Sequence, residues 1–196
     1  MCERYFDDLL RRLGTDYVDV MMLYQVDAGK EDFEAVLGNS EYIELAERLQ
    51  RQGKARYIGL SSHTTEPSRY AIESGVIDVL MYPINQAFDL LPGDCPIGAC
   101  FEGASYQELD MHVPNAQRQA LYQLCERRGI GLLSMKTYGG GYLLKDENVF
   151  GRAFSPGECI AYSLSKPGVC SAVIGCSHKN EMKKALKHEV GPDASD

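Results

Sequence analysis

Short apolar runs alternate along the chain with longer segments in which apolar residues recur at helical spacing. Four apolar residues of segment 5–14 share one helical face before Gly14 ends it: Phe6, Leu9, Leu10 and Leu13. The apolar run 17–24 is too short for a helix and predicts a strand buried on both faces. The pattern repeats, with helices expected over 40–53, 65–75, 114–129, 155–168 and 177–188, and strands over 55–60, 78–85, 130–136 and 169–175.

Residues that favour helix ends support these boundaries. Thr65 is expected to cap the short helix 65–75, with Pro67 in its first turn. Ser155 and Glu158 have the spacing of a capping box, in which each side chain bonds the other's backbone N–H. Gly53 supplies the C-terminal end of helix 40–53. The helix segments are therefore well delimited.

Alternating helices and strands without hairpin signals predict an α/β fold with a parallel sheet and right-handed crossovers. Two architectures remain open, a doubly wound sheet and part of a barrel. No Gly-x-Gly-x-x-Gly turn follows any strand, which weakens the first. Ligands bind at the carboxyl ends of the strands in both. The long connection 86–113 is expected to cover a site and to determine which substrate the site accepts.

Polar side chains follow most of the predicted strands directly. The strand ends are Tyr24-Gln25 with Asp27, Ser61-Ser62-His63, Asn85-Gln86, Lys136-Thr137 and Gly175-Cys176-Ser177. Any one of these groups is explained by a turn or cap that satisfies local backbone. Their recurrence at the carboxyl ends of parallel strands favours a polar ligand site on one rim.

The start of the last predicted helix and the glycine run before it each admit two interpretations. His178 and Lys179 lie in the first helical turn, where the macrodipole disfavours cations. Either an anion such as phosphate shares the site, or Lys179 is a solvated side chain. The run 139–141 of three glycines is either a loop that approaches a ligand closely or a plain linker.

The net charge and the cysteines limit which binding partners and which cellular compartment are expected. A formal net charge of -8 argues against nucleic acid or an anionic membrane, which attract basic surfaces. No apolar stretch reaches the length of a membrane span. Seven scattered cysteines indicate reduced thiols and a cytoplasmic location. Only Cys95 and Cys100 are close in sequence, and their spacing favours loop thiols over a metal site.

Five segments, in order, resemble the aldo/keto reductases. They are RLGTDYVDVMMLY, GKARYIGLSSH, INQAFDLL, LCERRGIGLLSMKTYGGG and SKPGVCSAVIGCSHKNEM. The similarity runs from about residue 3 to residue 186 and is strongest to the bacterial branch with Ser-Ser-His after a strand. That branch sometimes carries a cysteine-rich ferredoxin extension, and no such motif occurs here.

The resemblance implies a (β/α)8 barrel that binds NADP(H) and reduces small-molecule carbonyl substrates by hydride transfer, without a metal. Ser61, Ser62 and Gln86 match residues that hold the nicotinamide. The remaining implied cofactor contacts lie near the pyrophosphate and the adenosine phosphate: Lys136, Gly139, Gly140 and Gly141, and then Gly175, Ser177 and Lys179.

Three departures from the family pattern affect the expected activity. The chain begins where the family's third helix begins, so the strands that bring a catalytic Asp, Tyr and Lys are expected to be missing. Tyr24 stands at the position of the family's catalytic histidine. It is either a surrogate proton donor or a packing residue, because a tyrosine with a pKa of about 10 is a poor acid unless a lysine lowers it. Lys184-Ala185 replace a Glu-Asn pair that contacts adenine.

These observations predict an incomplete barrel domain over 1–190 with about five parallel strands, the first three strand–helix units missing, and a polar tail over 191–196. A complete barrel has eight strands, so five leave open edges that a second chain or an oligomer would cover. We expect an NADP(H)-dependent oxidoreductase of aldo/keto reductase type that is inactive as this isolated chain. Two alternatives are a non-catalytic nucleotide-binding or interaction module and an unrelated barrel enzyme that binds phosphate at the last helix.

Overall fold

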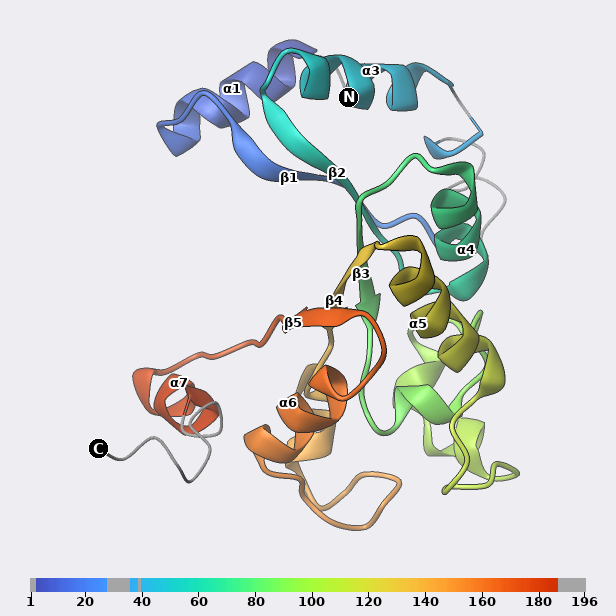
Figure 1. The fold of residues 1–196 in the computed structure, drawn as a ribbon. Coiled ribbons are helices and arrows are strands. Elements are labelled where there is room, and N and C mark those ends of the chain that lie inside the picture. The colour runs from blue at the N-terminus through green and yellow to red at the C-terminus, as the bar shows by residue number, and fades with distance from the viewer. Residues whose placement is uncertain (1–2, 28–35, 39, 187–196) are drawn as a thin grey trace.

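The computed structural model describes residues 3–27, 36–38 and 40–186. Its centre is one parallel sheet with the strand order β1-β2-β3-β4-β5 (Figure 1). The strands are β1 Val18–Leu23, β2 Ala55–Ser61, β3 Val79–Pro83, β4 Gly131–Met135 and β5 Val169–Ala172. A strand order that never reverses is that of a barrel and not of a doubly wound sheet, so the predicted partial barrel is confirmed.

Helices alternate with the strands, and Figure 1 shows α3 to α6 along the outside of the curved sheet. They are α1 Glu3–Leu13, α3 Ser40–Arg51, α4 Thr65–Ser74, α5 Ala116–Arg128, α6 Pro156–Leu164 and α7 Lys179–Leu186. No helix among the described residues is long and apolar enough to cross a membrane. The predicted tail 191–196 and the end of the last predicted helix lie outside the described residues.

Only one face of the sheet is fully buried. Leu80, Tyr82 and Leu132 face the helices and are 0% exposed. Their neighbours Met81 and Leu133 alternate with them and are half-buried. The prediction of strands covered on both faces was therefore wrong, because the second face is the inner face of a sheet whose outer strands β1 and β5 each pair with one neighbour among the described strands.

Several helix ends follow the sequence signals, and one does not. Gly14, Gly53 and Gly129 have φ values of +71°, +74° and +67° just after helices, as expected for left-handed C-terminal residues. Helix α4, in contrast, is not capped by Thr65. The carboxylate of Asp94 accepts the N–H groups of Thr65 and Glu66, each at 2.9 Å, so the cap comes from the long connection and not from the helix's own sequence.

The connection 86–113 is folded and contains three short 3-10 helices, η1 Phe88–Leu90, η2 Ala99–Phe101 and η3 Gly103–Tyr106. These pack into a second apolar core with the segment after β4 and with α6. Phe88 and Phe101 meet edge to face with ring centroids 5.3 Å apart. The connection therefore has a defined conformation beside the carboxyl ends of β3 and β4.

A buried polar network ties this connection to α5. Arg118 is 0% exposed, and its guanidinium donates to the carbonyls of Leu91, Pro83 and Pro92 at 3.0, 3.4 and 3.5 Å. The nearby Asp89 carboxylate accepts the hydroxyls of Tyr122 at 2.6 Å and Tyr162 at 2.9 Å. Buried charges are tolerated only when they are paired in this way, so the network fixes the path of the connection.

Candidate functional site

A pocket of about 930 Å³ lies at the carboxyl ends of β4 and β5. Its polar wall is formed by Lys136, Thr137, Ser177, Glu181 and Lys184. Aromatic and aliphatic side chains such as Tyr138, Phe154 and Ile174 complete the lining. An apolar pocket with a few polar groups at the strand ends of a barrel is the usual form of a small-molecule site.

The pocket gathers part of the predicted cofactor set. Five members line it, although β4 and β5 and their loops bring them from different parts of the chain: Lys136, Gly140, Gly141, Gly175 and Ser177. The other members of the set lie outside its lining: Gly139, Lys179, Ser61, Ser62 and Gln86. The structure thus brings together five of the residues that the resemblance places near the cofactor phosphates.

Left-handed backbone shapes the rim between β4 and η4, the 3-10 segment Gly139–Leu144. Lys136 has φ +54°, which is uncommon for a residue with a Cβ, and Gly140 has φ +64°. A Cβ at Gly140 would also lie 3.5 Å from the Phe101 ring. The positive φ of Gly140 therefore favours glycine at this turn, and Phe101 of the long connection packs beside it at an ordinary contact distance.

Glu181 accepts hydrogen bonds from the backbone N–H groups at the start of α7. Its carboxylate accepts the N–H groups of Ser177 at 2.6 Å and His178 at 3.2 Å. These hydrogen bonds, that to Ser177 foremost, hold the pKa of Glu181 below its usual range. The anion that the sequence suggested for this position is thus present within the chain, and Lys179 is exposed outside the pocket lining.

Tyr138 presents a buried hydroxyl to the same region. Its side chain is 8% exposed, and the hydroxyl has no hydrogen-bond partner among the described residues. Burial raises the pKa of Tyr138 to about 12, so it stays a neutral donor and acceptor at physiological pH. An unpaired buried hydroxyl is rare in native structures.

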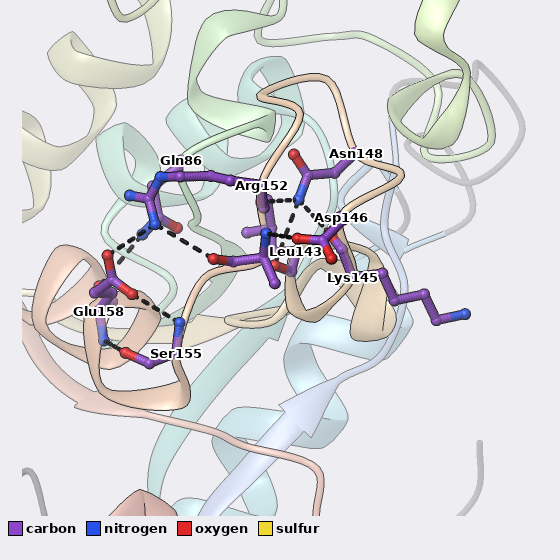
Figure 2. A network of polar contacts seen from close by, with 9 residues as sticks. Gln86, Leu143, Lys145, Asp146, Asn148, Arg152, Ser155 and Glu158 are labelled. Carbon is purple, nitrogen blue, oxygen red and sulfur yellow. Dashed lines mark hydrogen bonds and ion pairs between the residues drawn. The ribbon is translucent and has the colours of Figure 1, made fainter.

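A polar network, drawn in Figure 2, surrounds the chain segment between η4 and α6. The Asn148 amide donates to the carbonyls of Lys145 and Arg152, each at 2.6 Å. Arg152 in turn donates to the Glu158 carboxylate at 3.0 Å. The capping box is confirmed, with Ser155 and Glu158 bonding each other's backbone N–H. This network fixes Phe154 and Pro156, which line the pocket.

Glu158→Gln should make the stability of the chain less dependent on acid pH. The backbone and side chain of Ser155, and then Arg152, lower the pKa of Glu158, so its contribution is present above the unfolded pKa of about 4.5 and is lost as pH falls through the folded pKa. The variant should be less stable than wild type at pH 7 and equally stable at pH 2–3 in urea unfolding. Glu147→Gln, an exposed loop change, is the control, and a difference that persists unchanged into acid would contradict this account.

The residues expected at the nicotinamide lie at the ends of β2 and β3. Ser62 is 0% exposed, and its hydroxyl accepts the Thr64 N–H at 3.1 Å and donates to the Thr64 carbonyl at 3.0 Å, which is the local turn bonding that was the alternative for this motif. The Ser61 hydroxyl makes no hydrogen bond within the described part of the chain. Gln86 donates to the Glu158 carbonyl at 3.2 Å, and its buried oxygen has no partner there.

The sequence did not indicate that Asp27 and His63 pair. The Asp27 carboxylate accepts the His63 backbone N–H at 2.6 Å and lies 3.0 Å from Nδ1 of its ring. The two residues follow β1 and β2, which are parallel neighbours, so the carboxylate joins the ends of both strands. Both residues are among the polar residues that follow the predicted strands. Their contact could be predicted only from the order of the strands in the sheet.

Tyr24 lies on the surface. Its side chain is 78% exposed, and no lysine among the described residues bonds its hydroxyl. Without a bonded lysine in the described part of the chain, such a tyrosine is a poor proton donor. Its assignment as a surrogate acid stays a prediction.

Comparison with known proteins finds similarity to one family over part of the chain. Residues 1–90 match the model of the aldo/keto reductase family. Residues 1–90, under half of the chain, are thus similar to the aldo/keto reductases. An L-galactose dehydrogenase of Arabidopsis thaliana is 32% identical to it over 95 residues, which cover 44% of this chain and 28% of that protein.

The fold agrees with solved aldo/keto reductases. The holo form of the aldo-keto reductase AKR11C1 from Bacillus halodurans superposes with a TM-score of 0.67 at 18% identity, covering 96% of this chain and 58% of that one. Its apo form gives a TM-score of 0.65 at 19% identity, with coverages of 97% and 62%. The chain thus spans about three fifths of the structural neighbours and under a third of the plant relative.

Proposed function

We propose that this chain forms the part of an aldo/keto reductase that holds the phosphate-bearing portion of NADP(H), in a protein that reduces small-molecule carbonyl substrates. The observation that carries the proposal is the pocket in which Lys136, Gly140, Gly175 and Ser177 come together. Alcohol oxidation is the reverse of carbonyl reduction, and the name of the plant relative, a dehydrogenase, is consistent with the same hydride chemistry.

The pocket residues fit the phosphates of a dinucleotide. Lys136 and Lys184 supply two cations in the lining, and the Ser177 hydroxyl supplies a neutral donor. Lys184 stands where the family has an acidic residue, and here it adds positive charge to the wall. The unpaired Tyr138 hydroxyl offers a further donor to a bound nucleotide. Glu181 is the one lining group that repels an anion.

The orphaned oxygen of Gln86 supports the nicotinamide end of the same proposal. A carboxamide has an N–H₂ group that needs an acceptor, and the buried Gln86 oxygen is an acceptor without a partner among the described residues. Ser61, at the end of the neighbouring strand β2, carries a hydroxyl that can donate to the carboxamide oxygen. The Ser62 hydroxyl is already bonded to Thr64 and would fix the turn that follows Ser61.

NADP(H) supplies the hydride when it is bound, and the chain's own residues bind and orient it. Proton donation to the carbonyl oxygen has no strong candidate among the described residues, since Tyr24 is exposed and lacks a lysine partner. We therefore expect negligible turnover from the isolated chain. Mixing it with NADPH and a small aldehyde, and following the nicotinamide absorbance, tests this: a steady loss of absorbance that disappears in Tyr24→Phe would instead establish the tyrosine as the acid.

The exposure of Tyr24 favours a second candidate, a nucleotide-binding module without catalysis. Such a module binds NADPH as the first candidate does but leaves the aldehyde unreduced in every assembly that contains the chain. Reduction by a larger assembly that contains this chain would exclude the module.

Glu181→Gln should raise the affinity for NADPH. The substitution keeps an acceptor at the start of α7 but removes the charge that competes with a phosphate for the Ser177 and His178 N–H groups. We expect the dissociation constant from calorimetric titration to fall roughly three- to fivefold. Glu147→Gln, which lies outside the pocket lining, should leave it unchanged. An equal or weaker affinity in the Glu181 variant would show that no phosphate approaches these amides.

A further inference from the structure

Two thiols of the long connection share one acceptor. The Cys95 and Cys100 sulfurs lie 3.8 and 3.7 Å from the same carbonyl oxygen, that of Pro96. Cys95 is also close enough to Cys100 to raise the pKa of its thiol. Both sulfurs are free thiols in the structure. Residues five apart in the sequence are thus folded back so that their side chains meet.

The two thiols differ in access. Cys95 is half-buried, whereas Cys100 is 1% exposed within the second apolar core. Burial, and then the nearby Cys95, raise the pKa of Cys100 to about 12, so it does not react first with an external reagent. The Tyr106 hydroxyl donates to the Cys100 carbonyl at 2.8 Å and fixes the backbone there. An external oxidant therefore meets Cys95, with Cys100 held behind it.

We propose that Cys95 and Cys100 form a reversible dithiol–disulfide site that reacts with small-molecule disulfides such as oxidised glutathione. The Cys95 thiolate attacks one sulfur of the reagent, forming a mixed disulfide and releasing one glutathione thiol. Cys100 then attacks the Cys95 sulfur, and its proton goes to the second glutathione as that leaves. The dithiol is oxidised by two electrons, and one oxidised glutathione is reduced to two thiols.

The site adjoins the pocket through the residue that follows Cys100. The Phe101 ring packs on Phe88 and lies against Gly140, which lines the pocket. Closing the disulfide draws the two sulfurs to about 2.05 Å and pulls on the short helix that carries Phe101. Phe101 thus connects the dithiol to Gly140 at the pocket, although the chemistry of the dithiol stands independently of the nucleotide proposal.

Peptide mapping of the wild-type chain tests the proposal without any substitution. Trypsin releases residues 70–118 as one peptide, which contains Cys95 and Cys100 and no other cysteine. After equilibration of the folded chain with oxidised and reduced glutathione, this peptide should lose the mass of two hydrogens, and excess reduced glutathione should restore them. Exposed Cys170 serves as the internal control and should instead gain a glutathione.

If the fold positions Cys95 and Cys100 for reaction, the folded chain must favour formation of the disulfide. We expect the ratio of disulfide to dithiol to be about tenfold or more higher in the folded chain than in the chain unfolded in urea at the same glutathione ratio. Cys100→Ser should leave glutathione trapped on Cys95. The proposal is overturned if the wild-type peptide keeps both thiols, retains a glutathione adduct, links to another cysteine, or closes no better when folded than in urea.

Discussion

Replacing Arg118 with methionine is expected to lower the free energy of unfolding by about 3–5 kcal/mol. The guanidinium donates to three carbonyls, two of them in buried contacts, and lies within electrostatic reach of the Asp89 carboxylate. Its removal leaves the carbonyls without these donors and takes one of the stabilising charges away from Asp89. Methionine keeps most of the volume, which separates the lost polar contacts from a cavity. Urea unfolding followed by circular dichroism measures the difference.

Two further substitutions accompany this experiment, one as a control and one as a milder change in the same network. Arg128→Met alters an exposed arginine of the same helix and should change stability by less than about 0.5 kcal/mol. Tyr162→Phe removes one hydroxyl from Asp89 and should cost about 1–2 kcal/mol, which keeps the network testable if the arginine variant does not fold. Arg118→Met with near wild-type stability would show that the network is not what fixes the long connection.

Lys136→Gln is expected to weaken NADPH binding about tenfold, because a charge-assisted contact with a phosphate contributes about 1.5 kcal/mol or more. Lys136 lies in the pocket lining directly after β4, where its left-handed backbone turns the chain into the glycine rim. Glutamine keeps a long polar side chain and removes only the charge. Calorimetric titration at low and high salt gives the dissociation constants, and the wild-type advantage should shrink as salt screens the contact.

Lys145→Gln is the matched control for this prediction. Lys145 belongs to the same loop and is exposed, and its side chain points away from the polar network in Figure 2. It lies outside the pocket lining and should leave the dissociation constant unchanged. An equal loss of NADPH affinity in the two lysine variants would show that the effect comes only from the net charge of the chain.

Local signals predicted much of the fold, because the groups that decide it are close in sequence. Gly14, Gly53 and Gly129 each follow a helix in left-handed conformation, and the Ser155–Glu158 capping box forms as its spacing indicates. The alternation of helix and strand likewise predicted a parallel sheet. Five cofactor candidates meet at one pocket because parallel strands place their carboxyl ends on one edge.

Contacts between distant segments could not be predicted in this way. Asp94 caps a helix 28 or 29 residues before it in the chain, and Arg118 is buried by a connection whose path no periodicity defines. Glu181 was overlooked because its acceptor role depends on how the chain enters α7. The half-buried inner face of the sheet depends on the curvature of five strands and not on any one of them.

Titration of the purified chain with NADPH, followed by calorimetry, tests most directly whether the carboxyl ends of β4 and β5 form a dinucleotide site. We predict saturable binding of one NADPH per chain with a dissociation constant below about 1 mM, weakened by Lys136→Gln and strengthened by Glu181→Gln. The absence of heat or saturation at millimolar NADPH would contradict the account.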